Sequence, residues 1–243
     1  MPQCFGQHGA SHTTSDGEGQ MTGKENGGAA GPDGGAAGPD GGAAGPDGGA
    51  AGAARIVGSL RTEGRTGVVR VRGALAAGVE TVWAAITDPA HLARWHGKVD
   101  GDLRPGGSFH VYLESDDWEG TGHVDACDPP RHLAVTTRES EESWRKGRGA
   151  PPFDAVLEAT LAAAAAAADD DDDDDGSVLV VEVRGLPVDL LDAYGAGWQI
   201  HVENLAAYVE GGAAGDVEVR WAELLPAYRA LAGEAAELAE ASE

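Results

Sequence analysis

The strongest pattern of apolar and polar positions lies between Leu190 and Val209. Apolar residues recur there at steps of three and four, which places them in one stripe on a helix: Leu190, Leu191, Tyr194, Trp198, Val202, Leu205, Tyr208 and Val209. Gly211-Gly212 is a typical stop signal. Gly195 and Gly197 weaken the pattern and leave open a kink or a late start near Trp198. A stripe this aromatic needs a broad surface to bury it.

Upstream of this helix the pattern changes to alternation, which is typical of half-buried strands. The expected strands are 68–72, 109–113, 121–126, 132–138, 154–161 and 177–184. Short connections between them favour an antiparallel sheet. Turns are expected at Arg104–Gly107 and at Asp128–Pro130.

Two short helices are expected between the first two strands. The first carries Val79, Val82, Trp83 and Ile86 on one face, and the second carries Leu92 and Trp95. Asp88 is the expected N-cap of the second helix, with Pro89 in its first turn. Helices at both ends and strands between them predict an α+β domain, in which an antiparallel sheet curves around the long helix. Such an arrangement leaves space for a small-molecule cavity between sheet and helix.

The same patterns divide the chain. Residues 1–60 are rich in glycine and repeat Gly-Gly-Ala-Ala-Gly-Pro-Asp, a composition that predicts disorder. Residues 61–212 form the expected domain, interrupted at 162–176 by an alanine and aspartate insert that is also expected to be disordered. Residues 213–243 form a helical appendage that packs on the domain or on a second copy; both a monomer and a homodimer remain open.

Charge and cysteine content narrow the function classes. The net charge of −24 disfavours nucleic-acid binding and anionic membrane surfaces. No apolar run is long enough to span a membrane, and the N-terminus lacks a secretory signal. Cys4 and Cys127 are the two cysteines, and since one lies in the glycine-rich tail, we expect no structural disulfide and a cytoplasmic location.

Several sequence segments resemble a known group of proteins. Residues 82–89, 91–95 and 103–109 resemble the SRPBCC superfamily, and 128–131, Gly197-Trp198 and Asn204-Leu205 resemble, more narrowly, the activator of heat-shock-protein-90 ATPase homologue family in its stand-alone bacterial form. The resemblance covers about Thr66 to Glu210 and implies a helix-grip (START-like) fold. It implies no universal catalytic motif, and it suggests a chaperone partner only by analogy.

Motifs for established chemistry are absent from the sequence. There is no phosphate-binding loop, no Gly-x-Ser-x-Gly elbow and no His-Glu-x-x-His helix, so neither a cofactor nor a metal is expected. Cys4, His8 and His12 are spaced four apart but lack a fourth ligand. His110 and His123 could face one cavity from neighbouring strands, although surface positions are the simpler interpretation.

The expected cavity supplies the candidate site. The candidate ligand-binding residues are Phe109, Tyr112, Trp118, His123, Trp144, Trp198 and His201. For His201, a position inside the pocket and one at its rim are equally consistent with the pattern. Trp83 and Trp95 are expected in the core.

Three functions follow, in order of preference. The first is a binding module for a small apolar molecule, without catalysis. The second is a cyclase-like or hydratase-like enzyme that uses pocket histidines as acid and base. The third is a co-chaperone or regulatory interaction domain that uses the C-terminal appendage as its interface.

Overall fold

The computed structural model describes residues 56–113, 118–141, 152–164 and 176–240. The expectations for the glycine-rich tail, for Trp144 and for the aspartate run concern residues outside these ranges. Within them, the elements are β1 (Ile56–Glu63), β2 (Thr66–Leu75), α1 (Val79–Thr87), α2 (Pro89–Trp95), β3 (Lys98–Gly101), β4 (Ser108–Leu113), β5 (Trp118–Asp128), β6 (His132–Glu139), β7 (Asp154–Ala163), β8 (Ser177–Pro187), η2 (Val188–Leu190), α4 (Leu191–Val209) and α5 (Val217–Glu240).

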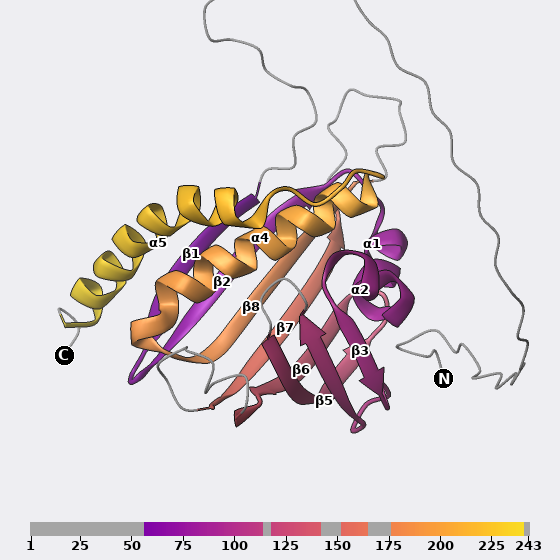
Figure 1. The fold of residues 1–243 in the computed structure, drawn as a ribbon, viewed down its shortest axis with the longest axis horizontal. Coiled ribbons are helices and arrows are strands. Elements are labelled where there is room, and N and C mark those ends of the chain that lie inside the picture. The colour runs from indigo at the N-terminus through magenta and orange to yellow at the C-terminus, as the bar shows by residue number, and fades with distance from the viewer. Residues whose placement is uncertain (1–55, 114–117, 142–151, 165–175, 241–243) are drawn as a thin grey trace, which may run out of the picture. The chain divides into compact units, whose positions relative to one another are not determined.

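The described strands form one eight-stranded antiparallel sheet in the order β1-β2-β8-β7-β6-β5-β4-β3. Figure 1 shows α4 lying across the sheet, with α5 beside β1 and with α1 and α2 near β3. The sheet and the long helix confirm the α+β helix-grip fold. Strands β7 and β8 pair up to Ala163 and Ser177 on either side of the insert, so Ala162 and Ala163 belong to the sheet.

The core lies between the sheet and the helices α1 and α4. Alternation sends apolar residues of each strand to this side, as in β8, where Leu179, Val181 and Val183 are buried. The helices complete the core with Val202 and Leu205 of α4 and Val82 of α1. The opposite face of the sheet carries ion pairs, such as Arg70 with Glu182.

The expected ends of the helices are confirmed. The Asp88 carboxylate accepts a 2.8 Å hydrogen bond from the backbone N–H of Ala90 and caps α2. Helix α4 ends before Gly211, whose φ of 77° is a left-handed conformation suited to glycine. The α4 helix begins at Leu191 and continues through Gly195 and Gly197, so the late start near Trp198 does not occur.

Two strands were not predicted. Strand β1 begins at Ile56, before the expected start of order near Arg61, and pairs with β2 along its length. Strand β3 has four residues. Both lie at sheet edges and show weak apolar alternation, because an edge strand has a neighbour on one side only.

The expectation of no structural disulfide is wrong. Cys127, in β5, is disulfide-bonded. The cysteine content therefore no longer supports a reducing compartment. Within the described ranges, no helix has the length and apolar character needed to cross a lipid bilayer.

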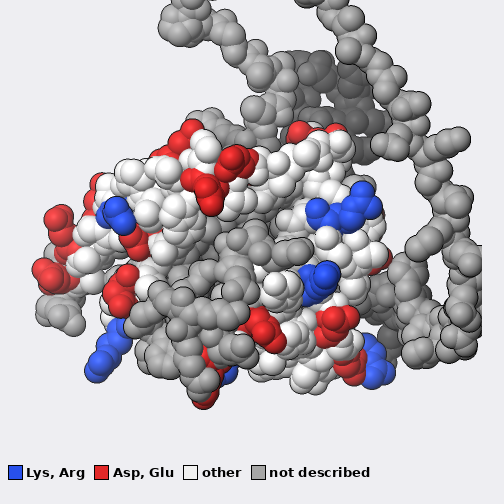
Figure 2. Space-filling model, in the orientation of Figure 1, with Lys and Arg blue, Asp and Glu red and all other residues white. Residues whose placement is uncertain are grey.

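The C-terminal helix α5 packs back on its own domain. Leu224 and Tyr228 are buried against Ala196 and Ile200 of α4. On the helical side of the molecule shown in Figure 2, acidic side chains are prominent, and α5 contributes the exposed Glu218, Glu223 and Glu237.

Candidate functional site

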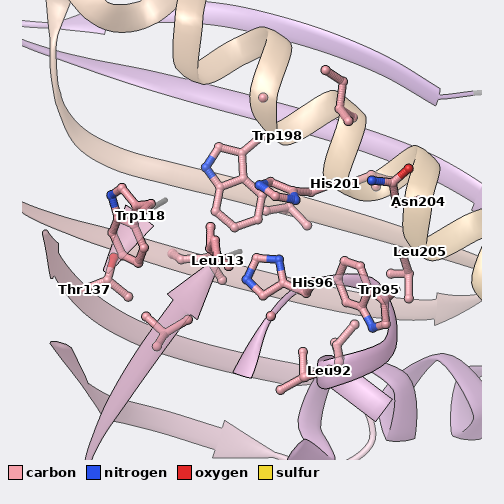
Figure 3. A pocket seen from close by; sticks show the side chains of 18 of the residues that line it. Leu92, Trp95, His96, Leu113, Trp118, Thr137, Trp198, His201, Asn204 and Leu205 are labelled. Carbon is pink, nitrogen blue, oxygen red and sulfur yellow. The ribbon is translucent and has the colours of Figure 1, made fainter. Parts of the chain in front are cut away.

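A cavity of about 900 Å³ lies between the sheet and α4. Strands β4 to β8 supply its floor, α4 its roof, and α2 and the first turns of α5 its sides. Figure 3 shows four side chains that project toward this space: Trp118 from β5, His96 from the residue after α2, and Trp198 and His201 from α4.

Mostly aliphatic and aromatic side chains form the walls. On β6 the odd-numbered residues Leu133, Val135, Thr137 and Glu139 all line the cavity, as the alternation of a strand requires. The cavity is therefore built from the same sheet face as the core, at the end where side chains from sheet and helix do not meet.

Two glycines of β5 make the floor wide. A Cβ atom at Gly122 would lie 2.5 Å from Cζ of Phe109, and one at Gly120 would lie 2.4 Å from Cη2 of Trp118. The rings of Phe109 and Trp118 thus lie over bare backbone instead of standing up into the cavity. These two positions require glycine because no Cβ fits beneath the rings.

One polar group beside the cavity is His96, which directly follows α2. Its ring contacts His201 edge to face at a centroid distance of 4.8 Å, and it lies nearly parallel to Trp198, at 6.3 Å and 29°. The backbone N–H groups of His96 and Gly97 both donate to the carbonyl of Leu92, which ends the helix and turns the chain toward β3.

Neighbouring residues hold His96 in place. Trp95 donates a 2.9 Å hydrogen bond from its indole N–H to the carbonyl of Ala85 on α1. A Cβ atom at Gly97 would lie 2.5 Å from the carbonyl oxygen of Tyr112, so the chain after His96 runs close against β4. The imidazole is thereby directed at the cavity.

Burial and, to a smaller extent, the nearby His201 imidazole together lower the pKa of His96 from 6.5 to about 3. The ring is therefore neutral at physiological pH. Its Nδ1 atom is buried and has no hydrogen-bond partner among the described residues.

A second buried polar group lies on β6. Glu139 is 8% exposed, and its Oε1 atom has no hydrogen-bond partner within the described ranges. With the Thr137 hydroxyl on the same face, it forms a polar strip along one wall.

Five of the seven sequence-predicted site residues line the cavity. These are Phe109, Tyr112, Trp118, Trp198 and His201. His201 lies beside His96 and Trp198, which places it inside the pocket. Trp144 lies outside the described residues.

His123 does not line the cavity. Its side chain is 52% exposed and bonds through Nε2 to Asp125 at 2.7 Å. His110 pairs in the same way with Glu119 at 2.8 Å. Both histidines lie on the outer face of the sheet, as the simpler interpretation held. Among the residues that the structure describes, no group of three or more metal-ligating side chains is found.

Sequence reasoning missed His96. Trp95, which was expected in the core, packs against the core cluster. Trp95 and also Trp221 of α5 border the cavity. No local signal distinguishes His96, because a histidine after a short helix is normally exposed. Its environment comes from α4, whose Trp198 and His201 pack around it.

The comparisons with known proteins agree with this architecture. A family model described as "Activator of Hsp90 ATPase homolog 1-like protein" matches residues 76–210. The crystal structure of CalU16 from Micromonospora echinospora is 25% identical, with a TM-score of 0.55, covering 74% of this chain and 99% of that one. Its solution structure gives 24% identity and a TM-score of 0.58, covering 76% and 99%.

A more distant structure has the same fold. The protein encoded by gene BPP1335 from Bordetella parapertussis is 22% identical, with a TM-score of 0.53, covering 74% of this chain and 92% of that one. No curated protein matches the chain.

Proposed function

The chain belongs to the Activator of Hsp90 ATPase homolog 1-like family, and we propose that it uses the fold of that family to bind a small, mostly apolar molecule between the sheet and α4. The observation that carries this proposal is the cavity of about 900 Å³ with walls of aliphatic and aromatic side chains. Ligand pockets typically have volumes of about 300–1,000 Å³ and this kind of lining.

Packing density supports the same function. Protein interiors are close-packed, and voids much larger than a water molecule are few in a domain. A cavity of this size lowers stability, because the side chains around it lose contacts that a filled core would provide. A ligand that fills it would restore these contacts and bury its own apolar surface.

Titration with a neutral fluorescent probe, N-phenyl-1-naphthylamine, tests the function directly. We expect saturable binding with a blue shift in emission, and we expect native mass spectrometry of freshly purified protein to reveal a bound small molecule. Loss of probe binding on Leu113→Trp, which fills the cavity from β4, locates the site. The matched control is Val57→Trp on β1, whose side chain is exposed. Absence of saturable binding to the unaltered protein would contradict the proposal.

The enzymatic alternative has weaker support. A general acid or base works best when its pKa lies near the working pH. The pKa of His96 is lowered to about 3, which makes this imidazole a weak base. His123, one of the histidines considered for this role, is bonded to Asp125 on the outer face.

A role as a partner-binding domain also loses part of its basis. It requires an apolar face on α5, but Leu224 and Tyr228 of that face are buried against α4. Binding of a small molecule therefore remains the proposed function.

A further inference from the structure

The polar surface of the cavity indicates which kind of molecule it takes. This inference rests on the proposed function, because it concerns the occupant of the same cavity. It starts from His96, whose Nδ1 atom is buried without a partner among the described residues.

The unpaired Nδ1 atom determines which nitrogen carries the proton. A neutral imidazole has one N–H donor and one lone-pair acceptor. Leaving a buried N–H unpaired is rarer in proteins than leaving an acceptor unpaired. The favoured tautomer of His96 therefore has its lone pair on Nδ1 and its proton on Nε2, which makes Nε2–H the donor that the ring can offer to a ligand.

The walls around this donor are flat and aromatic. The ring of Trp198 lies at 29° to that of His96, and the Trp95 ring lies at a centroid distance of 5.1 Å and an angle of 39°. On the floor of the cavity, Phe109 and Trp118 lie over Gly122 and Gly120. Flat aromatic walls favour planar aromatic ligands, which stack on them or meet them edge to face.

The occupant is uncharged at the atom that meets His96. Because this imidazole is neutral, a carboxylate placed against it would lose hydration without gaining an opposite charge. Arg94 and Lys98 also border the cavity, but their side chains are exposed to solvent.

We propose that the cavity binds a planar, uncharged aromatic compound with a carbonyl group, whose oxygen accepts a hydrogen bond from Nε2–H of His96. The aromatic rings supply most of the buried apolar area. The carbonyl fixes the orientation of the ligand relative to α4.

Competition against N-phenyl-1-naphthylamine with matched compounds tests this recognition. The compounds are 2-acetylnaphthalene, which has the carbonyl, 2-ethylnaphthalene, which lacks it, and 2-naphthoate, which has a carboxylate. The quantity compared is the affinity ratio of the acetyl to the ethyl compound. We expect His96→Phe to lower this ratio about three- to ten-fold, the range of one net hydrogen bond.

Two further variants separate the hydrogen bond from other effects. In His96→Gln the amide N–H lies near the position of Nε2, so we expect the ratio to stay within about three-fold of the wild-type value. His123→Phe removes an exposed histidine outside the cavity and should leave the ratio unchanged.

A vibrational measurement needs no variant. The carbonyl stretching band of 2-acetylnaphthalene bound to the wild-type protein should lie at the lower frequency of a hydrogen-bonded ketone. A band at the frequency seen in alkane solvent would overturn the inference, as would an unchanged ratio in His96→Phe or tighter binding of 2-naphthoate than of the ketone. In these cases the probe still binds and the proposed function stands. If neither the probe nor any of the compounds binds, the proposed function fails and this inference fails with it.

Discussion

The hydroxyl of Tyr228 on α5 donates a 2.7 Å hydrogen bond to Oε1 of Gln199 on α4. Both side chains are buried, with exposures of 2% and 8%. The Tyr228 ring lies where a Cβ atom of Gly195 would be, 2.3 Å from its Cδ1 atom. Gly195, which weakens the sequence pattern of the long helix, therefore leaves the space into which Tyr228 of the C-terminal helix packs.

Gly195→Ala tests the packing of Tyr228 against Gly195. In an exposed helix interior, replacing glycine by alanine stabilises by about 1 kcal/mol. At Gly195 we expect the reverse, a loss of about 1–3 kcal/mol, because the new methyl group overlaps the Tyr228 ring and the overpacked interface must shift. Urea unfolding followed by circular dichroism measures the change.

Gly197→Ala is the matched control on the same helix. A Cβ atom there would lie 3.6 Å from Trp221, an ordinary contact. We expect a stability gain of up to about 1 kcal/mol. Equal effects at the two glycines would show that Tyr228 does not pack against Gly195 in solution.

Trp198→Ala distinguishes a cavity wall from a solid core. Trp198 is partly buried and borders the cavity, so we expect a loss of only about 1–2 kcal/mol together with a marked fall in probe affinity. Trp83 of α1 points into the core and is 7% exposed. We expect Trp83→Ala to lower the free energy of unfolding by about 3–5 kcal/mol. A core-sized loss at Trp198 with unchanged probe affinity would argue against the cavity.

Glu182, on the outer face of the sheet, should make stability depend on pH in the acid range. Burial alone would raise its pKa, but hydrogen bonds from three arginines outweigh this and lower the pKa from 4.5 to about 2. The three are Arg61, Arg184 and Arg70. A depressed carboxyl pKa gives stability that is present above pH 4.5 and is lost as the pH falls toward 2.

Glu182→Gln should therefore destabilise at pH 7 by about 1–2 kcal/mol, a value reduced for the solvent exposure of the arginines. The difference from wild type should shrink between pH 4.5 and 2, the two values that bound the titration. Chemical denaturation at several pH values measures it, with Glu234→Gln on the exposed side of α5 as the control. A difference that does not change with pH would contradict the expectation.

His96 should also make stability depend on pH, in a higher pH range than Glu182 does. Burial and the neighbouring His201 lower its pKa from 6.5 to about 3, so the unfolded chain binds this proton more readily than the folded one. Stability should fall by up to about 1.4 kcal/mol per pH unit below pH 6.5, its unperturbed pKa. His96→Gln should remove this part of the slope between about pH 6.5 and 5, before most carboxylates titrate. An unchanged slope in that window would mean that His96 is accessible and protonated in the folded protein.

The sequence determined the elements and the type of fold. The periodicities of 3.6 and 2 depend only on neighbouring residues, and they located α4 and most strands. The cap at Asp88 and the stop at Gly211 are equally local, since each concerns one turn of backbone. Strand β1 escaped notice because an edge strand needs little apolar alternation.

Parts of the site also followed from the sequence. Trp198 and His201 lie on or next to the helix stripe, and the structure places both beside the cavity. The position of His123 on the outer face could not be predicted, because alternation separates the two faces of a strand but does not show which face is covered.

The tertiary structure alone decided the environment of His96 and the role of Gly195. His96 is enclosed because α4, far along the chain, packs Trp198 and His201 around it. Gly195 matters because Tyr228 of α5 occupies the space beside it. Burial, a lowered pKa and a cavity all arise where elements that are distant in the sequence pack against one another. A sequence pattern shows which surfaces are apolar, whereas their three-dimensional packing determines which ones touch and where a space remains.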